Sequence, residues 1–108
     1  MGFVATEVAY AAIAQAREVL QELEKHDSDL ANQARRAFSS IALNLEEGNR
    51  RAGRDRAYSF RVASGSNAEA CGALRIAVAW GYITPPNALL KSLDRLGGLL
   101  WGLTHARK

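Results

Sequence analysis

The chain has 108 residues and a formal net charge of +3, and 48% of its residues are hydrophobic but only 7% aromatic. This length suits one domain with one core, and polar side chains interrupt every apolar segment before the roughly 18 apolar residues that span a bilayer. The sequence starts with no signal-peptide pattern and has a single cysteine, Cys71, which excludes an intrachain disulfide, so we expect a cytoplasmic protein.

The first predicted helix covers about residues 6–25, where apolar residues recur at helical spacing opposite several glutamates. Polar residues from 26 to 29 break this pattern and supply N-cap candidates for the next helix. The second predicted helix covers about residues 29–48 and ends at Gly48. Its apolar stripe advances in steps of four, four, three and four, through Leu30, Ala34, Phe38, Ile41 and Leu45.

The third predicted helix covers about residues 55–80 and is ended by Gly81. Two glycines, Gly65 and Gly72, lie inside it, although each costs about 1 kcal/mol relative to Ala in a helix interior. We therefore expect this helix to be approached closely by another helix.

The fourth predicted helix covers about residues 85–104. Thr84 followed by Pro85 and Pro86 favours an N-cap with proline in the first turn. Leucines then recur at spacings of four and three, which is typical of a coiled-coil-like seam.

Short joints between these segments make neighbouring helices antiparallel. We therefore predict an all-α fold, an antiparallel up-down-up-down four-helix bundle that forms a single domain over residues 1–108. A core built largely of alanine also favours assembly into a homo-oligomer.

The positive charge is concentrated between residues 35 and 61, a segment that contains seven arginines but only three acids, Glu46, Glu47 and Asp55. Arginine favours bidentate contacts to phosphate or carboxylate. One interpretation is a solvated helical surface whose arginines pair with these acids; the other is a surface that binds nucleic-acid phosphates. The candidate nucleic-acid-binding residues are Arg35, Arg36, Arg50, Arg51, Arg54, Arg56 and Arg61.

Aromatic residues are scarce near these arginines. Tyr58 and Phe60 are the nearest, and Phe60 is expected in the core. Base stacking is therefore a weaker expectation than recognition of shape and backbone.

Catalytic and metal-binding patterns are absent from the sequence. His26 and His105 stand alone, without the ligand spacing that metal sites require. No phosphate-binding glycine motif is present, and Asn44, Glu46, Glu47 and Glu69 are the polar residues nearest a plausible interior. We therefore predict a protein that is not an enzyme and needs no cofactor or metal.

The stretch from Ser39 to Ile83 carries Ser-Ile, Asn44, Glu47-Gly48 and Arg51, then Gly65-Ser66 with Glu69, then Gly81-Tyr82. It resembles the four-helix-bundle proteins encoded in intervening sequences of bacterial 23S rRNA genes, and in fold the accessory variability determinant protein of diversity-generating retroelements. The resemblance implies a homopentamer with a basic surface and a role in binding RNA or DNA. It also implies structural or interface roles for Asn44, Glu47, Gly48, Arg51, Ser66 and Glu69.

This chain departs from the family pattern by placing Leu45 and Glu46 where an Ile-Ala pair is usual, and by a less aromatic start to the third helix. Two functional hypotheses follow. The first is a homo-oligomeric, pentamer-like module that binds RNA or DNA through the arginines. The second is an oligomeric scaffold or accessory protein that binds a protein partner such as a polymerase.

Overall fold

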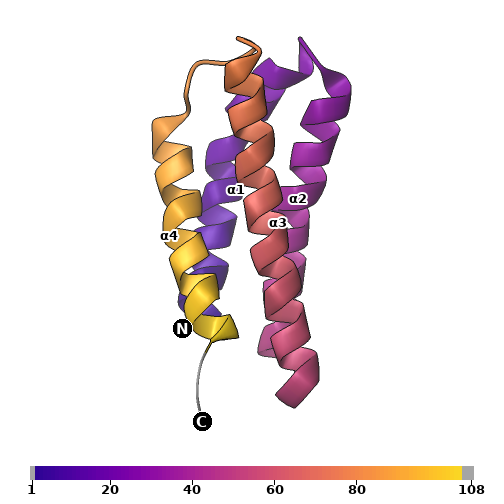
Figure 1. The fold of residues 1–108 in the computed structure, drawn as a ribbon, viewed down its shortest axis with the longest axis vertical. Helices are drawn as coiled ribbons and strands as arrows, with labels where there is room; N and C mark the ends of the chain where they lie inside the picture. Colours follow the sequence, from indigo (N-terminus) through magenta and orange to yellow (C-terminus); the bar gives the residue numbers. More distant parts are fainter. Residues whose placement is uncertain (1, 106–108) are drawn as a thin grey trace.

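The computed structural model describes residues 2–105 and contains four long helices, with no strand among these residues. The helices lie alongside one another in a rod whose principal extents are 45 × 22 × 19 Å (Figure 1). This confirms the predicted all-α, four-helix architecture. The helices are α1 (Gly2–Glu24), α2 (Ser28–Asn49), α3 (Gly53–Ala79) and α4 (Asn87–Thr104).

Each helix packs against two others, because α1 and α3 both contact α2 and α4. The joints α1–α2 and α3–α4 lie at one end of the rod, which we call the α1–α2 end (Figure 1). The α2–α3 joint lies at the opposite end, together with the start of α1 and the end of α4. We call this the α2–α3 end.

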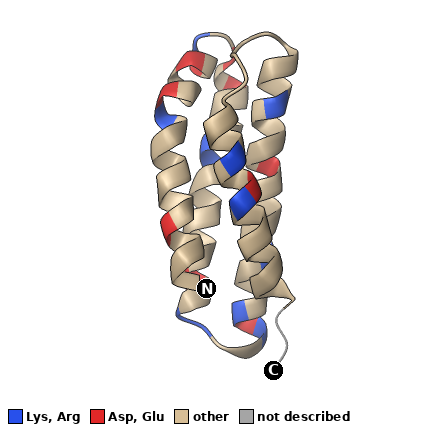
Figure 2. Ribbon diagram, turned by 90° about the vertical axis from the view of Figure 1, so that its left-hand side faces the viewer, with Lys and Arg blue, Asp and Glu red and all other residues tan. Residues whose placement is uncertain are grey.

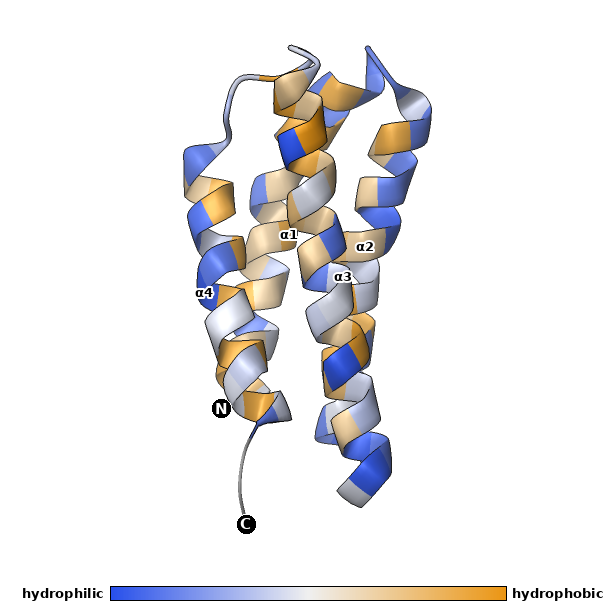
Figure 3. Ribbon diagram, in the orientation of Figure 1, coloured by the Kyte–Doolittle hydropathy of each residue, from blue (hydrophilic) through white to orange (hydrophobic). Residues whose placement is uncertain are grey.

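The core is built from one apolar stripe per helix. Apolar and polar residues alternate along the helices, as one buried face per helix requires (Figure 3). Twelve of the twenty-five buried hydrophobic residues among those described are alanine, so helices approach closely with few large side chains between them. The predicted stripe of α2 is buried along its whole length, at Leu30, Ala34, Phe38, Ile41 and Leu45.

Two helix termini follow the predicted capping chemistry. The Asp27 carboxylate accepts a hydrogen bond of 2.9 Å from the backbone N–H of Leu30, which caps the start of α2. Gly81 follows α3 with a positive φ of 80°. Its N–H bonds the carbonyl of Val78, and the Tyr82 N–H bonds the carbonyl of Ala77, each at 2.9 Å. This pair of bonds is a Schellman motif, which satisfies the last carbonyls of the helix.

The start of α4 differs from the prediction. The helix begins at Asn87, its N-cap position is Pro86, and Thr84 makes no capping bond. The reason is local sterics: a residue that precedes proline is kept out of the helical region, and Pro85 itself precedes Pro86. The two prolines therefore form the connection and do not fill the first turn.

Helices α2 and α3 approach most closely near the α2–α3 end. Gly48 is buried there against the ring of Phe60, where a methyl carbon added to Gly48 would lie 2.7 Å from Phe60 Cδ1. Further along the pair, the Ser66 hydroxyl donates to the Ser40 hydroxyl at 2.7 Å. These two contacts fix the register of the antiparallel pair.

The outer face of α3 is unoccupied in the described chain. A methyl group added at Gly65 or Gly72 would meet no atom within 4 Å. No helix of residues 2–105 therefore makes the close approach that these glycines led us to expect. Among the described helices, none has both the length and the apolar character needed to cross a membrane.

Candidate nucleic-acid interface

The seven candidate arginines do not form one cluster. Arg50 directly follows α2, whereas Arg35 lies fifteen residues earlier, about 22 Å along the helix. Arg35 also turns towards α1, where it forms an ion pair with Glu24. Arg35 and Arg36 are therefore separated from the other five arginines, which lie near the α2–α3 joint. A linear count of charge could not separate them, because helix length converts sequence separation into distance.

The remaining five arginines surround the α2–α3 end. Residues 50–61 hold five arginines and one aspartate, a net charge of +4. Residues 22–29, at the opposite end of the rod, hold four acids and one lysine, a net charge of −3. Figure 2 shows basic residues on both sides of the α2–α3 joint. The described chain is therefore basic at the α2–α3 end and acidic at the α1–α2 end.

Most of these arginines are free to bind a partner. Within residues 2–105, Arg50, Arg54 and Arg61 form no ion pair within 4.0 Å, and neither does Arg36. All four side chains are exposed. The alternative of arginines neutralised by the neighbouring acids accordingly applies to only part of the set.

Two arginines of this end are held by intramolecular contacts. Arg51 pairs with Glu47 one turn earlier, with Nη2 3.2 Å from Oε2. This hydrogen-bonded carboxylate raises the pKa of the Arg51 guanidinium above its ordinary value. The Arg56 guanidinium carbon lies 5.1 Å from the centre of the Phe60 ring, a cation–π arrangement. Phe60 itself is buried, as predicted.

Glu46 does not neutralise the arginines. Its Oε2 accepts a 2.8 Å hydrogen bond from the hydroxyl of Tyr10 on α1. That bond raises the pKa of the Tyr10 phenol. The glutamate that departs from the family pattern is thus engaged on the α1 side of α2.

A surface depression lies between α2 and α3 beside the unpaired arginines. Tyr58 and Ser59 belong to the α3 side, and Tyr58 is 64% exposed whereas Ser59 is only 5% exposed. On the α2 side, the Asn44 amide nitrogen donates to the Ser40 carbonyl at 2.9 Å and to its hydroxyl at 3.1 Å. We call this depression the α2–α3 groove; its lining residues are Asn44, Glu47, Arg51, Asp55, Tyr58 and Ser59.

Most of the family-motif residues lie between α2 and α3. Asn44, Glu47 and Arg51 line the α2–α3 groove, and Ser66 joins Asn44 through Ser40 in one hydrogen-bonded chain. Gly48 allows the close approach of the two helices. Glu69 is exposed on α3, beyond Ser66, and makes no side-chain hydrogen bond to another described residue. Five of the six positions therefore belong to one region between α2 and α3.

Sequence reasoning missed the groove as a unit. The sequence predicts little base stacking, because aromatic residues near the arginines are few, and no motif singles out Ser59. The available signal was spacing, because Arg54, Tyr58 and Arg61 follow at intervals of four and three and therefore share one face of α3.

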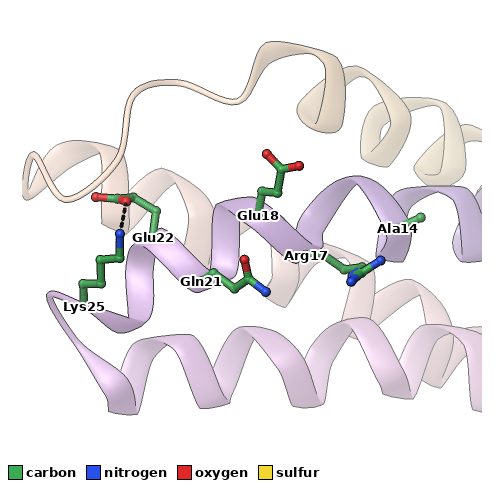
Figure 4. Close-up of a pocket in the computed structure, with 6 residues that line it drawn as sticks. All are labelled: Ala14, Arg17, Glu18, Gln21, Glu22 and Lys25. Atoms are coloured by element: carbon green, nitrogen blue, oxygen red, sulfur yellow. Dashed lines mark hydrogen bonds and ion pairs between the residues drawn. The ribbon is translucent and has the colours of Figure 1, made fainter.

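A second surface depression lies on α1 and does not bring together residues from two helices. Its lining side chains, including Arg17, Glu18, Glu22 and Lys25, come from α1 and the residue that follows it, and they mix both signs of charge (Figure 4). Glu22 and Lys25 pair across it at 3.2 Å. An open helix surface of this kind offers no enclosed polar group to a ligand.

The histidines are engaged in aromatic stacking. His26 lies on Tyr82, with ring centres 5.3 Å apart, and His105 lies on Trp101 at 4.2 Å. In the part of the chain that the structure describes, no three His, Cys, Asp or Glu side chains converge as metal ligands would. Cys71 is partly buried and packs against the core, as a small apolar residue does.

Comparison with known families assigns the chain to one of them. The sequence model of the 23S rRNA-intervening sequence protein family matches residues 4–102, which include nearly all of the four helices. The chain belongs to this family. No curated protein and no solved structure matches the chain significantly. The family assignment confirms the resemblance to the 23S rRNA-intervening sequence proteins noted in the sequence. Three of the motif residues, Asn44, Glu47 and Arg51, line the α2–α3 groove.

Proposed function

We propose that this member of the 23S rRNA-intervening sequence protein family is a non-enzymatic module that binds RNA or DNA through the α2–α3 end. The observation that carries the proposal is a set of exposed arginines that have no carboxylate partner among residues 2–105, namely Arg50, Arg54 and Arg61. The acidic opposite end supports it, because that end repels phosphate and so orients a nucleic acid on the rod. The family name, which refers to ribosomal RNA, is consistent with such a ligand.

The proposal includes the assembly of the chain. We propose a single antiparallel up-down-up-down bundle over residues 1–108, which forms a homo-oligomer in the cytoplasm; five is the subunit number that the family resemblance implies. Support for a partner surface comes from the outer face of α3, where small residues border open space. Ile76 and Trp80 are exposed further along α3 and at its C-cap. An oligomer would repeat the arginine surface and strengthen binding through multivalency.

The test compares two triple variants of equal charge. Arg50, Arg54 and Arg61 are changed together to Ala in one variant, and Arg17, Arg75 and Arg95, which lie elsewhere and are exposed, in the other. Each variant lowers the formal net charge from +3 to 0. Binding to labelled single- and double-stranded RNA and DNA is measured by fluorescence anisotropy, with light scattering to confirm that assembly is unchanged.

The proposal predicts salt-sensitive binding by the wild type, loss of binding in the first variant and retention in the second. Equal loss in both variants would mean that only net charge matters, which would contradict a site at the α2–α3 end. Absence of binding by an assembled wild-type protein at low salt would favour the alternative of a scaffold for a protein partner.

A further inference from the structure

The α2–α3 groove has properties that phosphate binding leaves unexplained. Two of its lining side chains are carboxylates, Glu47, which is paired with Arg51, and Asp55, which forms no ion pair within residues 2–105; the unpaired carboxylate repels a phosphate. The unpaired arginines lie around the groove and do not line it. The groove is therefore suited to a neutral group that brings hydrogen-bond donors to it, whereas the arginines outside it are suited to anions.

The groove also contains polar groups that are open to a ligand. Ser59 is only 5% exposed, and its hydroxyl makes no hydrogen bond to any residue between 2 and 105. That hydroxyl still reaches the surface, because Asn67 Oδ1 is the only fully buried side-chain polar atom among the described residues that lacks a partner. Asn44 uses its amide nitrogen on Ser40, and its carbonyl oxygen accepts no hydrogen bond within the same residues. Both residues border the groove, so a ligand placed there can form hydrogen bonds with them.

An exposed aromatic ring forms the edge of the groove. Tyr58 is 64% exposed, and its hydroxyl makes no hydrogen bond to another described residue. Arg54 and Arg61 lie one helical turn before and after it on the same face of α3. The rise of an α-helix places these two arginines about 10 Å apart along the axis, with the ring between them.

We propose that the α2–α3 groove holds one unpaired base of single-stranded RNA or DNA, stacked on Tyr58. The donors of the base meet Glu47, Asp55 and the Asn44 carbonyl, and the Ser59 hydroxyl bonds its edge. Arg54 and Arg61 contact the phosphates on either side. Aromatic rings flanked by basic residues bind single strands in this way, because every base has a face that can stack.

The inference rests on the proposed function and narrows it to single strands. In a duplex the bases are paired and stacked, so none can enter the groove without the cost of extrusion. The proposal therefore departs from the expectation from sequence that base stacking contributes little. Duplex binding, where it occurs, depends on the arginines alone.

The experiment uses the full chain, Tyr58→Ala, Tyr58→Phe and a matched control, Tyr10→Ala. Tyr10 is also an exposed tyrosine but lies on α1. Each protein is titrated into a labelled single-stranded RNA and into the same strand annealed to its complement. Circular dichroism and light scattering confirm equal fold and assembly, which an exposed residue is not expected to change.

We expect Tyr58→Ala to weaken single-strand binding by about 5- to 150-fold, the effect of losing one base–aromatic stack. Duplex binding by this variant stays within about twofold of the wild type, and Tyr58→Phe and Tyr10→Ala retain single-strand affinity. An equal loss on both substrates, or no loss on the single strand, would overturn the inference. If the triple variant of Arg50, Arg54 and Arg61 still loses binding in that case, the proposed function stands, but the α2–α3 groove does not bind a base. If the wild-type protein binds neither substrate, the proposed function itself is wrong.

Discussion

The contact between Gly48 and Phe60 yields the sharpest prediction about stability. In Gly48→Ala, the added methyl carbon would lie 2.7 Å from one carbon of the Phe60 ring and closer to the next. Favourable carbon contacts begin near about 3.5 Å. Phe60 is only 1% exposed, so its ring cannot swing into solvent. Overpacking of this kind costs about 1–3 kcal/mol.

Helix propensity offsets part of this cost, because Ala is favoured over Gly by at most about 1 kcal/mol within a helix. The net expectation is a loss of about 1–2 kcal/mol in the free energy of unfolding. For a chain of this size, each kcal/mol lowers Tm by about 4–8 °C, so the loss corresponds to a fall of about 4–16 °C in Tm. Differential scanning calorimetry of wild type and variant at equal protein concentration measures the difference.

A matched substitution separates the two contributions. Gly98 lies within α4, and a methyl group added there meets no atom within 4 Å. Gly98→Ala should therefore raise stability by about 0.5–1 kcal/mol through propensity alone. Combining Gly48→Ala with Phe60→Leu should give less than the sum of the two single losses, because the smaller side chain relieves the clash. A Gly48→Ala protein as stable as the wild type, or full additivity in the double variant, would refute the reasoning.

Three further predictions concern capping, pH and assembly. Asp27→Ala removes the side-chain cap of α2 and should lower the free energy of unfolding, measured by urea denaturation, by about 1 kcal/mol. Asp29→Asn alters no observed cap and should cost less, so equal losses would contradict the capping role. The raised pKa of Tyr10 means that the folded state holds the phenol proton more tightly than the unfolded state does. The stability from this bond is therefore present below the ordinary tyrosine pKa of about 10 and is lost as pH rises through the folded value. Tyr10→Phe should abolish that part of the alkaline loss, as seen by chemical denaturation at neutral and alkaline pH, and unchanged pH dependence would exclude the bond as its cause. Ala68→Glu, on the exposed outer face of α3, should reduce the mass in light scattering towards the 11.7 kDa of one chain, and an unchanged oligomer would remove this face from the interface.

The fold was largely accessible from the sequence because its determinants are local. The apolar stripe of α2 and the glycine after α3 depend on helical periodicity and on one positive φ, and both follow from neighbouring residues. The prediction for the start of α4 was wrong for an equally local reason. Thr84 and a following proline favour the start of a helix, but the second proline keeps the first out of the helical region.

The candidate site was less accessible because it depends on packing between helices. Whether Glu46 pairs with an arginine or with Tyr10 is decided by the rotation of α2 against α1. The burial of Ser59 and the exposure of Tyr58 are decided in the same way, by how α3 rests on α2. The spacing of apolar residues fixes the rotation of a helix about its axis only to within about one residue position. An error of that size is enough to exchange a buried side chain for an exposed one.

The salt dependence of binding tests the central claim, that arginines at the α2–α3 end contact phosphates, most directly. The logarithm of the association constant for single-stranded RNA is measured against the logarithm of salt concentration, for the wild type and for the two equal-charge triple variants. This slope is negative, and each lost phosphate contact reduces its magnitude by about 0.7. The account predicts that changing Arg50, Arg54 and Arg61 to Ala reduces the magnitude by about 2. Changing Arg17, Arg75 and Arg95 leaves it unaltered. Equal slopes for all three proteins would contradict the account.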